Sequence, residues 1–222
     1  GEDTTVESGR LSLDYDAAEG QGWTLDGRVG QLNLGDVALG ALELDGAGEV
    51  VLADGALSEV TGGVQFAAER LSFAEPGLAA AIGDRIAGEA EFNFTPGNAV
   101  DITGLSITGS DYGLTGNMLV SGLSSGITVS VDMDARYSDL SRLSALADRQ
   151  LTGGANASVE GYYVVLNRSF DLDAQVTGTD IALDQPQLDR LLGGRSTINL
   201  EARRDETGIE IEDLTLNASR LT

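Results

Sequence analysis

The chain has 222 residues, of which 41% are hydrophobic, and its formal net charge is −23 with all 13 basic residues being arginine. So negative a charge argues against binding to a nucleic-acid backbone or an anionic leaflet, because both surfaces attract clusters of lysine and arginine. Since the chain contains no cysteine and no histidine, a disulfide framework and a thiolate metal site are excluded. We interpret the acidic residues as a solvated outer face.

The N-terminal third consists of alternating apolar and polar residues. From Arg10 to Val64 the period is two almost everywhere, which is typical of strands with one buried face. Gly46-Ala47-Gly48 and Asp54-Gly55 are predicted as turns between short strands, because glycine and aspartate favour turn conformations. The same alternation returns further along, for example from Ile127 to Met133.

Three short amphipathic segments interrupt the strands, and the last of them is the clearest. Leu188, Leu191 and Leu192 are spaced to lie on one side of about two helical turns. Pro186 fits the start of such a helix, and the glycine pair Gly193-Gly194 fits its end. The sequence therefore predicts short helices at 75–83, 139–146 and 185–192. They either lie over the mouth of a groove, cap a bend, or cover a sheet edge.

The predicted fold class is mainly β. We expect roughly 15 or 16 strands of about five to seven residues, joined by connections too short for parallel crossovers. Periodicity by itself leaves three arrangements open, namely a sandwich, a barrel and an open curved sheet. The helical segments suggest a degenerate repeat within one continuous unit spanning 1–222, with approximate sub-repeats at 1–70, 71–136, 137–180 and 181–222.

No stretch indicates catalysis or metal binding. Gly122 to Gly126 matches the G-x-S-x-G nucleophile pattern, but the chain has no histidine base and a strand follows, so we interpret the stretch as a hairpin turn. The Asp132 and Asp171 stretches start like calcium loops but lack the required glycine and glutamate, and we assign their aspartates to the wet face of strands. We therefore predict no enzyme activity, cofactor or metal.

Several stretches do resemble a known family. Leu188 to Gly194 is followed by Ala202 to Gly208 and then by Asp213 to Leu216. This order is similar to the repeating unit of the TamB family, the AsmA-like inner-membrane subunit of the bacterial translocation and assembly module. Asp111 to Gly116 and Ser8 to Leu11 are similar to its connecting strands. The resemblance spans most of the chain and is clearest from Leu71 to Leu221.

The resemblance implies an elongated, curved, largely antiparallel sheet, a U-shaped β-taco with an apolar concave face and a few short helices. It implies a periplasmic segment of a longer protein, tethered to the inner membrane by an N-terminal anchor outside this chain. Expected partners are phospholipid acyl chains, neighbouring β-taco segments of the same chain and, through other parts of the protein, an outer-membrane TamA-like barrel.

The expected function is a lipid-transfer conduit that supports outer-membrane biogenesis. An alternative within the family is a chaperone-like scaffold for outer-membrane proteins and autotransporters, and another alternative is an acidic extracellular β-rod such as an adhesin stalk. Lipid tails need a continuous apolar lining, which the inward residues of an alternating sheet supply. The expected groove lining is Leu11, Leu13, Trp23, Leu25, Leu42, Leu44, Val64, Phe66, Phe92, Phe94, Ile102, Ile107, Ile127, Val129, Val131, Phe170, Leu172, Val176, Ile198, Leu200, Ile209, Ile211, Leu214 and Leu216.

Overall fold

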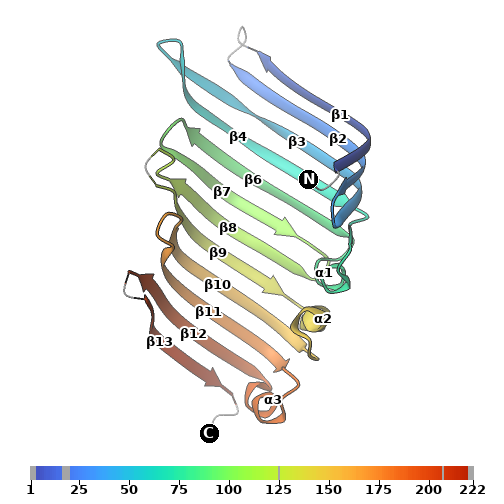
Figure 1. Cartoon of the computed structure of the whole chain (residues 1–222), viewed down its shortest axis with the longest axis vertical. Coiled ribbons are helices and arrows are strands. Elements are labelled where there is room, and N and C mark those ends of the chain that lie inside the picture. The colour runs from blue at the N-terminus through green and yellow to red at the C-terminus, as the bar shows by residue number, and fades with distance from the viewer. Residues whose placement is uncertain (1–3, 17–20, 125, 207, 220–222) are drawn as a thin grey trace. The chain divides into compact units, whose positions relative to one another are not determined.

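The structure is a computed structural model that describes residues 4–16, 21–124, 126–206 and 208–219. The chain divides into two compact units, an N-terminal unit of Gly1–Ser110 and a C-terminal unit of Asp111–Thr222. Each unit is built on antiparallel strands that pair with their neighbours in the sequence (Figure 1).

The N-terminal unit contains seven strands and one helix among its described residues. Six strands lie side by side in chain order, and the two-residue strand β5 pairs with β3 instead. The elements are β1 (Thr4–Asp16), β2 (Gly22–Leu34), β3 (Val37–Ala53), β4 (Ala56–Glu69), β5 (Ser72–Phe73), α1 (Pro76–Ile82), β6 (Arg85–Thr95) and β7 (Ala99–Thr108).

Among its described residues, the C-terminal unit has six strands in strict chain order, and its helical segments lie in two of the connections. The elements are β8 (Tyr112–Ser121), β9 (Thr128–Tyr137), the 3₁₀ turn η1 (Leu140–Leu143), α2 (Ser144–Ala147), β10 (Thr152–Val164), β11 (Ser169–Ala182), α3 (Pro186–Leu192), β12 (Arg195–Asp205) and β13 (Gly208–Ala218).

The mainly β, antiparallel prediction is confirmed, but the strands are fewer and longer than expected. The described residues form thirteen strands, and β3 alone is 17 residues long. Gly46-Ala47-Gly48, predicted as a turn, lies in the middle of β3 and pairs with both neighbouring strands. That prediction was wrong because these glycines leave space for a side chain from the next strand. Asp54-Gly55 is a turn, as predicted.

All three helical predictions are confirmed. α1 and α3 both begin with a proline in the first turn. Gly83 follows α1 with a φ of 83°, and Gly194 follows α3 with a φ of 83°, a conformation that glycine adopts most easily. The middle segment starts as a 3₁₀ turn, where the Asp139 side chain accepts a hydrogen bond from the Ser141 N–H.

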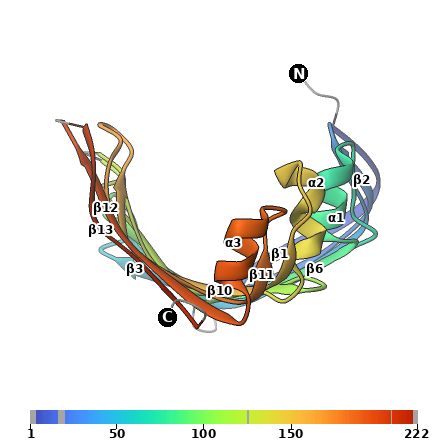
Figure 2. The same cartoon turned by 90° about the horizontal axis from the view of Figure 1, so that it is seen from below.

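Each unit is a single layer of strands, and no second sheet covers it within the described residues. β1 pairs only with β2, and β13 only with β12. In Figure 2 the strands of the C-terminal unit curve, and α3 lies on the inner side of that curve. Of the three arrangements that periodicity allows, the open curved sheet is the one that forms.

Candidate functional site

Each unit has one apolar face, which follows from the strand register. In an antiparallel sheet, residues directly opposite one another share a face, and every second residue along a strand shares it too. In the N-terminal unit one such row runs across six strands as Leu11, Gly27, Leu44, Phe66, Gly88 and Ile107. In the C-terminal unit a corresponding row is Val131, Gly161, Leu172, Ala202 and Ile211.

The register places the expected groove residues on these apolar faces, with one exception. Ile127 precedes β9, and its carbonyl accepts a hydrogen bond from the Val165 N–H at 2.9 Å. In two places the sequence spacing changes parity, between Ile102 and Ile107 and between Ile211 and Leu214. The register shifts between Glu89 and Glu91 and between Glu201 and Ala202 compensate for this change. At each shift the partner strand, β7 or β13, contains one extra residue, so the apolar residues on both sides of it lie on the same face.

The apolar faces are largely uncovered. Among the described residues only Trp23, Ala68, Ala81 and Leu192 are buried hydrophobic side chains. Leu13 remains 69% exposed and Leu214 63% exposed. The chain exposes 13605 Å² in total, whereas a compact monomer of 23.0 kDa exposes about 9,600 Å². Each unit is thus an amphipathic sheet that no second layer covers within the described residues.

Trp23 is the largest buried side chain of the N-terminal unit. Its indole lies across Gly48 and Gly62, and its ring centroid is 5.9 Å from that of Phe92 on β6. The indole N–H donates a hydrogen bond to the Thr61 carbonyl at 3.0 Å. Sequence reasoning did not identify this arrangement. Gly48 and Gly62, which occupy apolar positions of β3 and β4, could have indicated space for a large neighbouring side chain.

The apolar face of the C-terminal unit is the concave one. α3 packs on β11, and it lies inside the curve of its own unit (Figure 2). The apolar-face positions of β11 and β12 nearest to α3 are Gly178 and Ser196. Both residues are buried, and Ser196 is 2% exposed. α3 therefore covers one end of the concave face, and the rest stays accessible.

A polar cluster lies at the start of β8 and the end of β9 in the same unit. Tyr112 and Tyr137 stack with ring centroids 5.7 Å apart, and Arg142 forms an ion pair with Asp111. Burial raises the pKa of both tyrosines, and the nearby Arg142 charge partly opposes that rise. The stacked rings join the ends of β8 and β9, and the ion pair joins the start of β8 to η1.

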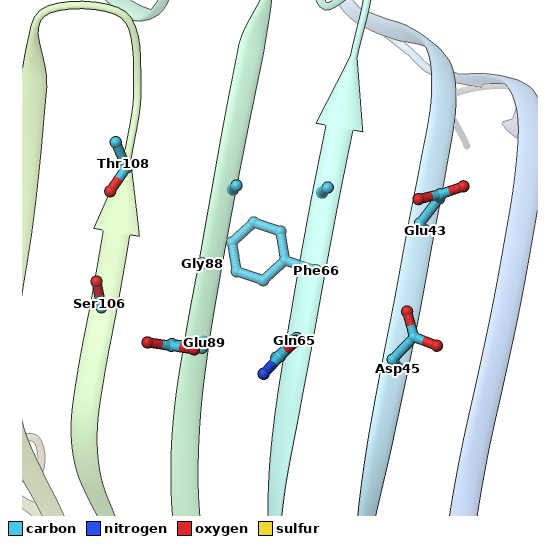
Figure 3. Close-up of a pocket in the computed structure, with 10 residues that line it drawn as sticks. Glu43, Asp45, Gln65, Phe66, Gly88, Glu89, Ser106 and Thr108 are labelled. Carbon is cyan, nitrogen blue, oxygen red and sulfur yellow. The ribbon is translucent and has the colours of Figure 1, made fainter.

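The opposite face of each sheet is polar. One shallow depression on this face lies on the N-terminal unit and has a volume of about 420 Å³. Figure 3 shows its residues on four neighbouring strands, with Glu43, Asp45 and Glu89 on the polar side and the Phe66 ring beside Gly88. Within the described residues no group of three or more acidic side chains is arranged to hold a metal ion.

Comparisons with protein-family models, with curated proteins and with solved structures found no match to this chain. The TamB resemblance, and the function, partners and location that it implies, therefore remain predictions. The described part of the chain contains no helix long and apolar enough to cross a membrane.

The two sequence patterns that were set aside have the expected structures. Gly122 and Gly126 belong to the connection between the paired strands β8 and β9, and the Gly126 N–H donates to the Gly122 carbonyl at 2.9 Å. Ser125 lies outside the described residues. Asp132 and Asp173 lie on the polar face, directly opposite Glu160 from either side. Both patterns are accordingly parts of the strand framework.

Proposed function

We propose that the apolar faces hold the acyl chains of phospholipids, and that this chain is a segment of a lipid-transfer conduit in the periplasm. One observation carries the proposal, namely that each unit has an apolar face on which the described residues place no second layer. Leaving apolar surface in water costs about 25 cal/mol per Å², and monomeric proteins rarely expose such patches unless a partner covers them.

The composition of the face favours acyl chains over a small polar ligand. A small-molecule site places a few polar groups among apolar walls. Here the row across β9 to β13 consists of Val131, Gly161, Leu172, Ala202 and Ile211, and the adjoining row on the side of α3 is similarly apolar. Such a lining takes hydrocarbon without fixing its position, which suits a conduit. No catalytic group is part of the proposal.

A second candidate rests on the sheet edges. In β13, which pairs on one side only, Ile209 is 68% exposed and Ile211 is 59% exposed. An unpaired strand offers backbone hydrogen bonds to an added strand. This observation favours the chaperone-like scaffold, in which unfolded outer-membrane strands pair with an edge. An adhesin stalk would need neither an open apolar face nor lipid.

Lipid extraction tests the proposal. Purified protein is extracted with organic solvent, and phospholipid is measured by mass spectrometry relative to protein. We expect bound phospholipid in the wild type and a loss of at least about tenfold in Leu172→Asp, because a carboxylate on the apolar face disfavours hydrocarbon contact.

The matched control is Gln175→Asp, which introduces the same charge on the same strand but on the polar face. It should retain lipid at the wild-type level. Folded wild-type protein that carries no phospholipid, and takes none up from vesicles, would contradict the conduit and favour the scaffold.

A further inference from the structure

The register pairs positions of β8 to β13 across the apolar face of the C-terminal unit. Among these paired positions, Arg204 is the one charged residue. It lies directly opposite Phe170 on β11 and Ile209 on β13. The preceding apolar-face residues of β12 are Ala202, Leu200 and Ile198. Arg204 is half-buried, whereas its sequence neighbours Arg203 and Asp205 are exposed on the polar side.

The two adjacent arginines differ in their partners. Arg203 donates two hydrogen bonds to Glu210 and forms a second ion pair with Glu212 at 2.8 Å. Within the described residues, Arg204 forms no salt bridge and makes no side-chain hydrogen bond or ring contact. A guanidinium prefers bidentate anionic partners, and phosphate and carboxylate both fit that preference. An unpaired guanidinium at the end of an apolar face is thus complementary to an amphiphile with an anionic head.

We infer that Arg204 binds the anionic head group of an acyl lipid whose chain extends along the concave face toward α3. This inference rests on the proposed function and adds the class of lipid and its orientation. The strand from Arg204 to Ser196 is about 26 Å long at 3.3 Å per residue, which accommodates a long acyl chain. Beyond Ser196 the face is covered by α3, so the chain end lies under the helix.

The net charge of −23 does not prevent this contact. At physiological salt the Debye length is about 8 Å, so carboxylates on the far face of the sheet are largely screened, while a direct guanidinium contact is not. The preference for an anionic head should therefore be local to Arg204 and should not follow the total charge of the chain.

A pair of lipids that differ only in a phosphate provides the test. Oleoyl lysophosphatidic acid and monoolein share one acyl chain and a glycerol, and their binding is compared below the concentration at which they form micelles. We expect the wild-type chain to bind the phosphate-bearing lipid about tenfold more tightly. Arg204→Gln should abolish that preference and leave monoolein binding unchanged, and Arg204→Lys should retain part of it.

The matched control is Arg203→Gln, which changes the total charge by the same amount on the polar face. Its preference should equal that of the wild type. An equal loss in both glutamine variants, or no preference in the wild type, would overturn the role of Arg204. If neither lipid binds to the wild type, the proposed function itself fails. Oleate, which has a carboxylate head, serves as a further probe. If oleate binds as tightly as lysophosphatidic acid, Arg204 accepts any anionic head group, and if oleate binds more weakly, Arg204 prefers phosphate.

Discussion

At the scale of single residues, Trp23 explains why β3 is continuous. The indole needs space above the neighbouring strands, and Gly48 and Gly62 provide it by lacking side chains. Adding a Cβ at Gly62 would overlap the indole and would lie 2.6 Å from the Ala47 carbonyl oxygen. The geometry of this sheet requires glycine at both positions, where it serves packing and not chain reversal.

We predict that Gly62→Ala lowers the free energy of unfolding by about 1–3 kcal/mol, because the added methyl group overpacks the site. Gly63→Ala is the matched control, since its Cβ would meet nothing closer than the Ala90 oxygen at 3.8 Å. Urea unfolding followed by the fluorescence of Trp23, the single tryptophan, measures both. Equal stabilities of the two variants would refute the packing role of Gly62.

At the scale of secondary-structure elements, each seven-residue helix has one buried apolar side chain, and α3 covers one end of the concave face. Leu192 of α3 is 6% exposed, and Ala81 of α1 is 6% exposed. Seven residues make a helix that is marginal on its own, so the packing of one or two side chains must stabilise it. Asp189 assists by accepting a hydrogen bond from the Leu183 N–H at 2.7 Å.

Leu192→Ala should therefore destabilise the C-terminal unit by about 2–5 kcal/mol, the usual cost of a cavity at a buried leucine. Leu188 on the same helix is 38% exposed, so Leu188→Ala should cost clearly less. Urea unfolding monitored by circular dichroism compares the two variants. A larger effect at Leu188 would show that α3 packs through a different side.

At the scale of the whole molecule, the negative charge is concentrated in rows on the polar faces. One row in the C-terminal unit places Asp132, Glu160, Asp173, Glu201 and Asp213 directly opposite one another on five consecutive strands. Like charges in opposite positions destabilise a sheet. The acidic face keeps an open amphipathic sheet soluble and lowers its stability at the same time.

We predict that Glu160→Gln raises the free energy of unfolding by about 0.2–1 kcal/mol at low salt, because it removes the middle charge of this row. The gain should nearly vanish in 1 M NaCl, where the Debye length is about 3 Å. Glu49→Gln is the control, since Glu49 lies opposite Gly22 and Thr61 and has no acidic partner across the strands. A gain that persists at high salt would rule out charge repulsion as its cause.

Much of this structure was predictable because the sequence signals for strands and helix ends are local. Alternation identified the apolar faces, and short amphipathic spacing followed by glycine identified the three helices, two of which also begin with a proline. The strand count was not predictable, since Gly46 and Gly48 resemble turn residues until Trp23 is known to lie beside them. Arg204 was also overlooked, because in the sequence it is one of two adjacent arginines, and only the register assigns them to opposite faces.

The sequence by itself determined that the chain is mainly β, that its strands are amphipathic and that its charge lies on one side of them. These properties follow from a two-residue period and from composition. The tertiary structure alone decided which residues face one another across strands, where α3 covers the concave face, and that the described residues form no second layer. Such features depend on pairing between distant segments, and a period of two is compatible with a covered sheet as well as with an open one.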